Sequence, residues 1–206
     1  NKVTITVPVK GTKRELVRMV KKNAIDMIDK YGDKYAKRFE TNLLALEEIK
    51  DLIHLDKIPQ RIEAYDISNI SGVESVGSMV VFENGESKKS DYRKFRIKTI
   101  IGADDYGSHR EVITRRFRRG VEEKKSLKES SFSNFPDLIM MDGGKGQVNV
   151  AKEVLDSFGI DIDVCGLVKD EFHTTRGIIY NDVEYGLPVD SKGYKMIYKI
   201  QEEVHR

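Results

Sequence analysis

The sequence has 206 residues, of which 39% are hydrophobic and 34% are charged, and its formal net charge is +2. This balance excludes intrinsically disordered and membrane-embedded chains and predicts a globular protein with a core of its own. The single cysteine, Cys165, excludes an internal disulfide and, without neighbouring Cys or His ligands, does not indicate a zinc site.

Neither a signal peptide nor an apolar run of membrane-spanning length can be recognised in the sequence. We therefore expect a cytoplasmic protein with no membrane partner. Because the sequence begins without Met and stops within a segment of helical pattern, we also expect it to be a piece of a longer protein.

Residues 1–60 are expected to form a mainly helical N-terminal arm. Residues 3–8 alternate as a short strand, and apolar residues then recur at helical spacing over residues 16–28 and again over residues 43–53. Pro59 follows the second helical stretch and marks its end. The arm is therefore predicted to contain two helices that lead into a core domain over residues 61–206.

From Arg61 the pattern becomes that of strands. The segments RIEAYDISN, GSMVVFENG and SDYRKFRIKT predict a three-stranded meander with a hairpin turn at residues 83–86. A polar helix over about residues 104–125 and a Ser-rich loop follow. Next come the buried strand DLIMMD, a glycine turn, the helix VNVAKEVLDSF, the strand DVCGLV, a strand pair around GIIY and DVEYG, and a last helix from about Ser191. This order predicts an α/β fold with a mixed sheet and helices on both faces.

Asp66 lies among apolar residues of the first core strand, in YDISN. A buried ionised carboxylate has to be paired, hydrogen-bonded or bound to a cation, because leaving it uncompensated destabilises the fold severely. Two interpretations are open for this residue alone. It is either a cation ligand or an acceptor of backbone N–H groups from a turn at residues 68–72.

Asp142 ends the strand LIMMD, and Gly143, Gly144 and Gly146 follow it before the helix. Active sites of open α/β sheets lie at the carboxyl ends of strands, and glycines there let a metal or phosphate approach the backbone. The segment GGKGQ lacks the glycine spacing and the Ser/Thr of a nucleotide-binding P-loop. Taken alone, Asp142 is better interpreted as a helix N-cap beside a tight turn.

Other candidate residues have ordinary interpretations when each is taken alone. His205, on the last helix, and His173, in KDEFHTTRG, are typical of surface histidines. Asp104 and Asp105 open the helix after the meander, where acidic residues commonly act as caps. One of these two aspartates is enough to cap the helix, so a role in a nearby site stays open for Asp105.

Four arginines lie within about one and a half turns of that helix: Arg115, Arg116, Arg118 and Arg119. A solvated charged face is the ordinary interpretation of such a run. Arginine is, however, the side chain best suited to paired hydrogen bonds with phosphate, so contact with a DNA backbone is the alternative. Three more basic residues flank the candidate site and are candidates for the same contact: Lys145, Lys169 and Arg176.

Five segments together resemble the C-terminal nuclease half of the UvrC family, in the same order and at fitting intervals. They are RIEAYDISNISG, DDYGSHREVITRRFRRG, PDLIMMDGGKGQVNVA, GLVKDEFHTTRG and EEVHR. The YDIS strand and DGGKGQ are the most specific parts, and the resemblance covers nearly all of residues 61–206. It implies a ribonuclease-H-like core with a mixed five-stranded sheet and flanking helices, preceded by the helical arm.

The resemblance also implies a site. It assigns catalytic and metal-binding roles to Asp66, Asp142 and His205, and Asp105 matches a further acidic position of the fold. Two divalent ions about 4 Å apart can align a water molecule and stabilise both the transition state and the leaving oxygen. We therefore expect Mg²⁺ or Mn²⁺, with Asp66 bridging the ions, Asp142 holding one of them, and the nitrogen of His205 favouring Mn²⁺.

The implied function is an incision 5′ to a lesion during nucleotide excision repair, in damaged double-stranded DNA held by UvrB, with UvrA acting upstream. The UvrB-binding segment and the paired helix-hairpin-helix module of the family are not recognisable, so weak DNA binding by this chain alone is expected. A catalytically silent ribonuclease-H-like module that binds DNA or UvrB is the alternative. An Argonaute-type nuclease would share the Asp-Asp-His set, but the surrounding motifs do not resemble it.

Overall fold

The computed structural model describes residues 7–70, 74–100, 102, 104–127, 130–170 and 174–206. The chain divides into two units, Asn1–Thr41 and Asn42–Arg206. The second unit begins before residue 60, where we expected the core to start, because the last turns of helix α1 (Gly11–Leu52) bury Ala45, Leu46 and Ile49 in its core. No helix of the described residues combines the length and the apolar character needed to cross a membrane.

α1 is one continuous helix of 42 residues, with residues up to Thr41 in the first unit and the rest in the second, rather than the two helices expected from the sequence. The connecting residues 29–42 contain no proline, and Tyr31, Tyr35 and Phe39 continue the helical spacing through them. The lone Gly32 costs only about 1 kcal/mol relative to alanine, which does not break a helix. Most of the strand predicted for residues 3–8 lies outside the described residues.

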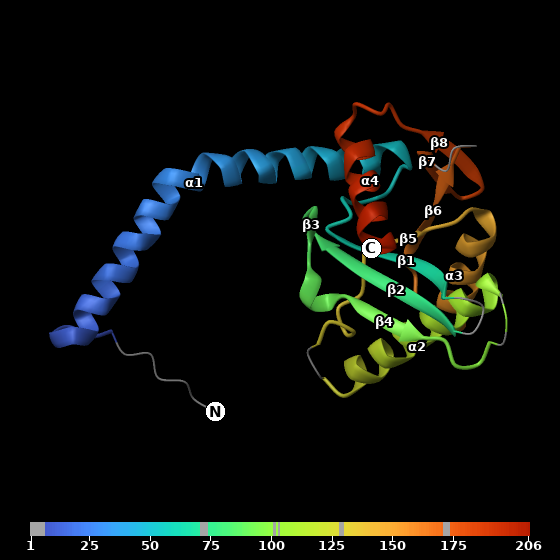
Figure 1. Ribbon diagram of the computed structural model, residues 1–206, viewed down its shortest axis with the longest axis horizontal. Coiled ribbons are helices and arrows are strands. Elements are labelled where there is room, and N and C mark those ends of the chain that lie inside the picture. The colour runs from blue at the N-terminus through green and yellow to red at the C-terminus, as the bar shows by residue number, and fades with distance from the viewer. Residues whose placement is uncertain (1–6, 71–73, 101, 103, 128–129, 171–173) are drawn as a thin grey trace. The chain divides into compact units, whose positions relative to one another are not determined.

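The described strands of the second unit form one eight-stranded mixed sheet, in the order β3-β2-β1-β5-β6-β7-β8 with β4 paired to β2 (Figure 1). Their bounds are β1 Arg61–Ile70, β2 Glu74–Glu83, β3 Glu86–Ser87, β4 Arg93–Arg96, β5 Leu138–Met141, β6 Asp163–Lys169, β7 Thr175–Tyr180 and β8 Val183–Gly186. The strands β1, β5 and β6 are parallel, and the remaining pairs are antiparallel. The predicted α/β class and mixed sheet are confirmed. The strand pair expected around GIIY and DVEYG corresponds to β7 and β8, and the sheet is larger than the five strands that the resemblance implied.

The predicted hairpin turn at residues 83–86 joins β2 to the two-residue β3. Asn84 and Gly85 have φ values of 52° and 76° there, the left-handed conformations that a tight two-residue hairpin requires. A 3-10 helix, Lys89–Asp91, then leads to β4, which returns to pair with β2. The meander therefore contains β1, β2 and β4, with β3 as a short addition.

Helices cover both faces of the sheet (Figure 1). α2 (Asp105–Lys125) and α3 (Lys145–Ser157) pack on one face, while α4 (Lys192–His205) and the end of α1 pack on the other. Because side chains alternate along a strand, Ile62 and Ala64 of β1 lie in the α4 core and Tyr65 lies in the α2–α3 core. This alternation decides which polar residues at the strand ends share a face.

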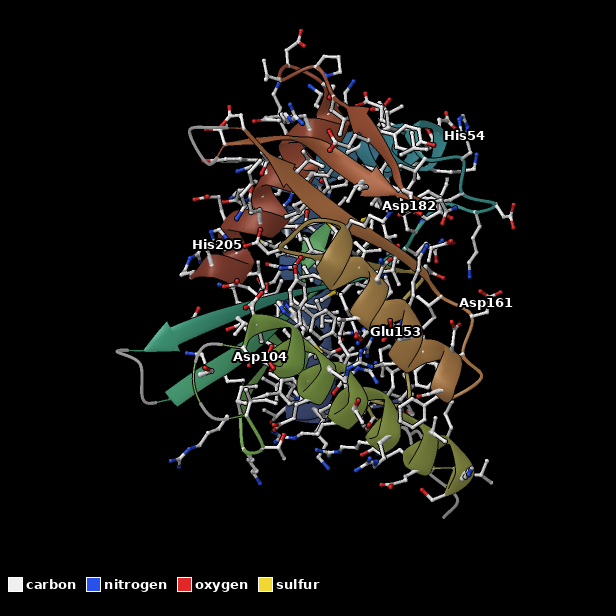
Figure 2. All side chains as sticks on the ribbon, turned by 90° about the vertical axis from the view of Figure 1, so that its right-hand side faces the viewer. His54, Asp104, Glu153, Asp161, Asp182 and His205 are labelled. Carbon is white, nitrogen blue, oxygen red and sulfur yellow. The ribbon has the colours of Figure 1, made fainter. Side chains whose placement is uncertain are left out.

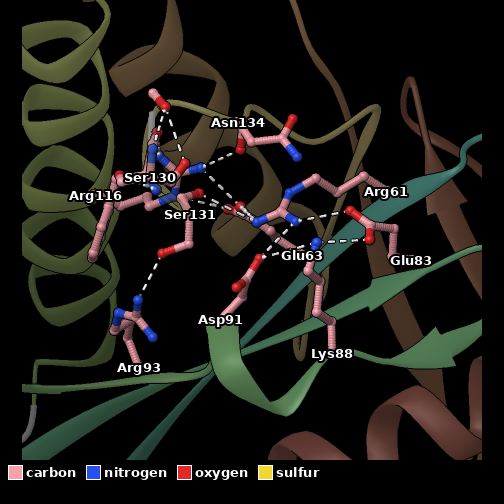
Figure 3. A network of polar contacts seen from close by, with 12 residues as sticks. Arg61, Glu63, Glu83, Lys88, Asp91, Arg93, Arg116, Ser130, Ser131 and Asn134 are labelled. Carbon is pink, nitrogen blue, oxygen red and sulfur yellow. Dashed lines mark hydrogen bonds and ion pairs between the residues drawn. The ribbon is translucent and has the colours of Figure 1, made fainter. Parts of the chain in front are cut away.

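A buried ion-pair network ties α2 to β1 (Figure 3). Arg116 lies 2.8 Å from Glu63, and both side chains are completely buried. The Arg116 guanidinium also donates to the carbonyl oxygens of Phe132 and Asn134, so it anchors the loop that precedes β5. The Tyr65 hydroxyl donates to the same Glu63 carboxylate at 2.6 Å. The network is therefore part of the core.

Candidate metal centre at the ends of β1 and β5

Two carboxylates meet where the parallel strands β1 and β5 end. Tyr65 and Met141 are register partners, and the Asp142 N–H donates to the Tyr65 carbonyl at 2.9 Å, which brings Asp66 and Asp142 to the same level. Ile62 and Ala64 on β1, and Leu138 and Met140 on β5, lie in the α4 core. By alternation, Asp66 and Asp142 therefore project from the face that α4 covers.

α4 adds an imidazole to these carboxylates. Its N-cap Ser191 accepts a hydrogen bond from the Tyr194 N–H, and its apolar side, which includes Ile197, Ile200 and Val204, packs on the sheet. The last residue of the helix, His205, lies with Nε2 2.5 Å from Asp142 Oδ2. Figure 2 shows His205 at the end of α4, on the same side of the core as the start of α2, marked by Asp104.

Asp66, Asp142 and His205 each offer one ligand atom, and these atoms lie within 4.8 Å of one another. Burial, and then the charge of Asp142, raise the pKa of Asp66 above its ordinary value, while His205 and the hydrogen bond from Ser68 act in the opposite direction. The side chain of Asp142 is only 5% exposed, and its Oδ1 lies 2.9 Å from the ammonium of Lys169. Two close carboxylates beside an imidazole fit a divalent cation.

Neither ordinary interpretation of the two carboxylates matches their surroundings. β1 continues through Asp66 to Ile70, and the side-chain donor to Asp66 is Ser68 at 3.3 Å. The N-cap of α3 is Gly144 rather than Asp142, so the capping interpretation of Asp142 is wrong. Within the described residues, the charged partners of Asp142 are therefore Lys169 and His205 rather than the backbone N–H groups of a helix.

Asp105 is not one of the three residues that converge, although it lies at the same end of the sheet. The cap of α2 is Asp104, whose carboxylate accepts from the Gly107 N–H at 2.9 Å. Asp105 is the first residue of the helix, and its carboxylate accepts a hydrogen bond from Gln147 at 3.1 Å. Its role in catalysis stays a prediction.

The basic residues expected to contact DNA have different surroundings. The prediction that Arg116 contacts the DNA backbone is wrong, because its guanidinium is fully buried against Glu63 and cannot reach a phosphate. Arg115 pairs with Glu111 and Arg119 with Glu123, whereas Arg118 is exposed. Two others form exposed ion pairs, Lys145 with Asp182 and Arg176 with Glu184. Lys169 instead contacts Asp142.

Sequence reasoning missed His109, which lies in the second turn of α2 and is 1% exposed. Its Nδ1 lies 3.0 Å from the Asp105 carbonyl oxygen, its Nε2 has no hydrogen-bond partner among the described residues, and its charge acts to lower the pKa of Asp66. The sequence feature that could have pointed to His109 is its position four residues, or about one helical turn, after Asp105. His173 lies outside the described residues.

Gly146 also has an explanation that the sequence did not supply. A Cβ at this position would clash with the ring of Tyr106, which is 52% exposed at the start of α2. The missing side chain therefore lets the first turns of α2 and α3 approach each other beside Asp142.

Comparison with known proteins identifies related chains. The model of the UvrC RNAse H endonuclease domain matches residues 50–206. UvrABC system protein C of Clostridium beijerinckii is 57% identical over 213 residues, covering 100% of this chain and 34% of that protein. The homologue from Finegoldia magna is 52% identical over 206 residues, covering 100% of this chain and 33% of that protein. The chain thus spans about a third of the length of these curated relatives.

Among solved structures, endonuclease V of Ciona intestinalis, in complex with a DNA containing an inosine, aligns with 69% of this chain and 60% of its own. The identity is 12% and the TM-score 0.37. The family match confirms the ribonuclease-H-like fold that the sequence motifs implied. The chain belongs to the UvrC family and carries its ribonuclease H endonuclease domain.

Proposed function

We propose that this domain is a divalent-metal-dependent DNA endonuclease that makes the incision 5′ to a lesion during nucleotide excision repair. In this proposal its substrate is the damaged strand of double-stranded DNA held by UvrB, after UvrA has acted upstream. The single observation that carries the proposal is the convergence of Asp66, Asp142 and His205 at one sheet edge. The names of the relatives place them in the UvrABC system, which supports the repair context.

Each of the three side chains has a role that follows from its surroundings. Asp66 and Asp142 would hold Mg²⁺ or Mn²⁺ through carboxylate oxygens, and His205 would supply a nitrogen ligand. A bound divalent ion activates water and stabilises the charge that develops on a phosphodiester in the transition state. The Ser68 hydroxyl donates to Asp66, and β5 fixes the start of the segment that carries Asp142, so both carboxylates are oriented in advance.

His205 is the part of the site that faces solvent. Its side chain is 40% exposed, whereas that of Asp142 is 5% exposed, so a DNA backbone can approach from the imidazole side. The contact with Asp142 Oδ2 holds one ring nitrogen, Nε2, toward the site. The imidazole is therefore placed to hold a proton or a metal ion beside the scissile phosphate.

Exposed basic side chains would guide the DNA to this edge. Lys145 follows the glycine turn directly and its side chain is 58% exposed, so it is suited to a phosphate next to the site. Arg118 is exposed on α2, about 20 Å along the helix from its first residue. A backbone contact there would position the duplex away from the reacting phosphate.

The test is incision of a duplex that carries one lesion and an end label on the damaged strand, with UvrA, UvrB and full-length UvrC containing this domain. Asp66→Asn and Asp142→Asn should each abolish the 5′ incision, while the exposed Asp161→Asn should retain it. Loss of the Mn²⁺-dependent or Mg²⁺-dependent product in the first two variants supports the proposal. Unchanged 5′ incision in Asp142→Asn would refute it.

A further inference from the structure

A fourth charged side chain reaches the same sheet edge from the third parallel strand. Cys165 and Leu167 of β6 lie in the α4 core, so alternation directs Lys169 to the face that carries Asp66 and Asp142. The pairing of β6 with β7 shifts register there, because Val168 pairs with Gly177 and Lys169 pairs with Thr175, which places the extra residue on β7. The alternation of β6 is therefore unbroken up to Lys169.

Lys169 engages both oxygens of Asp142. Its Nζ lies 2.9 Å from Oδ1 and 3.0 Å from Oδ2, where it donates a hydrogen bond. Oδ2 also lies 2.5 Å from His205 Nε2. The ammonium thus occupies the side of the carboxylate that would otherwise be open to a metal ion.

Burial distinguishes this contact from the other ion pairs near the site. The side chains of Lys169 and Asp142 are 28% and 5% exposed, whereas those of Lys145 and Asp182 are 58% and 63% exposed. Exposed ion pairs contribute little to stability because water screens their charges. The interaction of a partly buried ammonium with a buried carboxylate is screened much less. Lys169 is therefore part of the charge balance of the site.

The ammonium also changes how much positive charge the site can accept. Asp66 and Asp142 together carry two negative charges and Lys169 carries one positive charge, so with neutral His205 the formal sum is −1. One divalent ion brings this sum to +1, and a second would bring it to +3. Without Lys169 the corresponding sums are 0 and +2, so the lysine opposes each ion that binds.

We propose that Lys169 is an internal cation of the centre. It is a positioning residue that holds the Asp142 carboxylate and takes the place of one divalent ion there, so that a single ion binds between Asp66, Asp142 and His205. This inference rests on the proposed metal-dependent function, and it replaces the pair of ions expected from the sequence. It also differs from the phosphate contact first expected for Lys169, which would leave metal affinity unchanged.

Calorimetric titration of Mn²⁺ into metal-free, full-length protein tests the proposal. Lys169→Met keeps the length of the side chain but removes the charge, and it should tighten Mn²⁺ binding by about tenfold or more, since a divalent ion and a unit charge a few Å apart repel strongly even in water. Lys169→Arg should bind Mn²⁺ like the wild-type protein. Lys145→Met, with the same charge change in an exposed pair, should remain within about twofold of it.

A second pair of variants links the effect to Asp142. In an Asp142→Asn background, Lys169→Met should tighten Mn²⁺ binding less than it does in the wild-type background, because Asp142 no longer holds the ammonium beside the ion. If Lys169→Met unfolds, the thermal shift that Mn²⁺ produces in Lys169→Gln supplies the same comparison, because binding to the folded state raises Tm.

Several results would overturn the proposal. Equal or weaker Mn²⁺ binding by Lys169→Met, or two ions bound at the wild-type centre, would refute the internal cation and leave the proposed nuclease function standing. If the wild-type protein binds no Mn²⁺ in a way that depends on Asp66 and Asp142, both the internal cation and the proposed metal-dependent function are refuted.

Discussion

Replacing Arg116 with methionine should destabilise the second unit strongly. The substitution removes the nearer of two arginines that pair with Glu63, whose side chain is 0% exposed, and leaves that buried carboxylate with only Arg61, at 3.6 Å, as a charged partner. Breaking a buried ion pair by removing one partner costs about 3–5 kcal/mol. The same change also removes the donors to the carbonyl oxygens of Phe132 and Asn134, at 2.7 Å and 3.1 Å, which moves the expected loss toward the upper end of that range.

Urea unfolding followed by circular dichroism measures this loss. For a domain of this size, about 3–5 kcal/mol corresponds to a fall in Tm of roughly 6–20 °C. Arg118→Met, two residues away and exposed, should stay within about 0.5 kcal/mol of the wild-type protein. The double variant Glu63→Leu/Arg116→Met should lose less than the two single variants added together, because no unpaired charge is left. An Arg116→Met protein as stable as Arg118→Met would refute the structural role of Arg116.

Three further outcomes follow from the site. The pKa of Asp66 is raised in the folded state, chiefly by burial and then by Asp142, so the metal-free protein binds this proton more tightly than the unfolded chain. Its stability should therefore fall as pH rises from about 4, and Asp66→Asn should lose this part of the slope in thermal melts with EDTA; an identical slope contradicts the assignment. His205→Ala should reduce 5′ incision at least about tenfold while the fold is retained, and wild-type rates in the incision assay exclude its role. Arg118→Ala should lower the slope of log K against log salt for DNA binding by about one, and an unchanged slope excludes a phosphate contact.

The strand-level features of the site could be predicted from the sequence. Apolar alternation in RIEAYDISN and an apolar run that ends in DGG indicate two strands, and the order of the elements indicates a mixed sheet. Asp142 follows a strand, and parallel strands present their carboxyl ends at one edge of the sheet. Its position at that edge could therefore be predicted from the sequence. Its association with Asp66 and His205 rested on the motif resemblance, because sequence spacing does not specify which side chains meet.

Other features depend on tertiary contacts that a local pattern does not contain. Arg116 looks like its neighbours along α2, yet it turns into the core because Glu63, on an adjacent strand, faces it there. Lys169 looks like a surface lysine, but it continues the side of β6 that carries Cys165 and Leu167 and so reaches Asp142. The continuity of α1 was missed for a different reason, because two apolar stretches were taken as separate helices although Tyr31, Tyr35 and Phe39 continue the helical spacing between them.

The convergence of Asp66, Asp142 and His205 on a cation is tested most directly by a crystal structure of the domain soaked in Mn²⁺, with anomalous diffraction to locate the ion. We predict one strong anomalous peak bound by oxygens of both carboxylates at roughly 2.0–2.3 Å, with the imidazole nitrogen of His205 as a further ligand. A peak elsewhere in the domain, or carboxylates that remain bound to Lys169 and His205 with no anomalous density between them at saturating Mn²⁺, would contradict it.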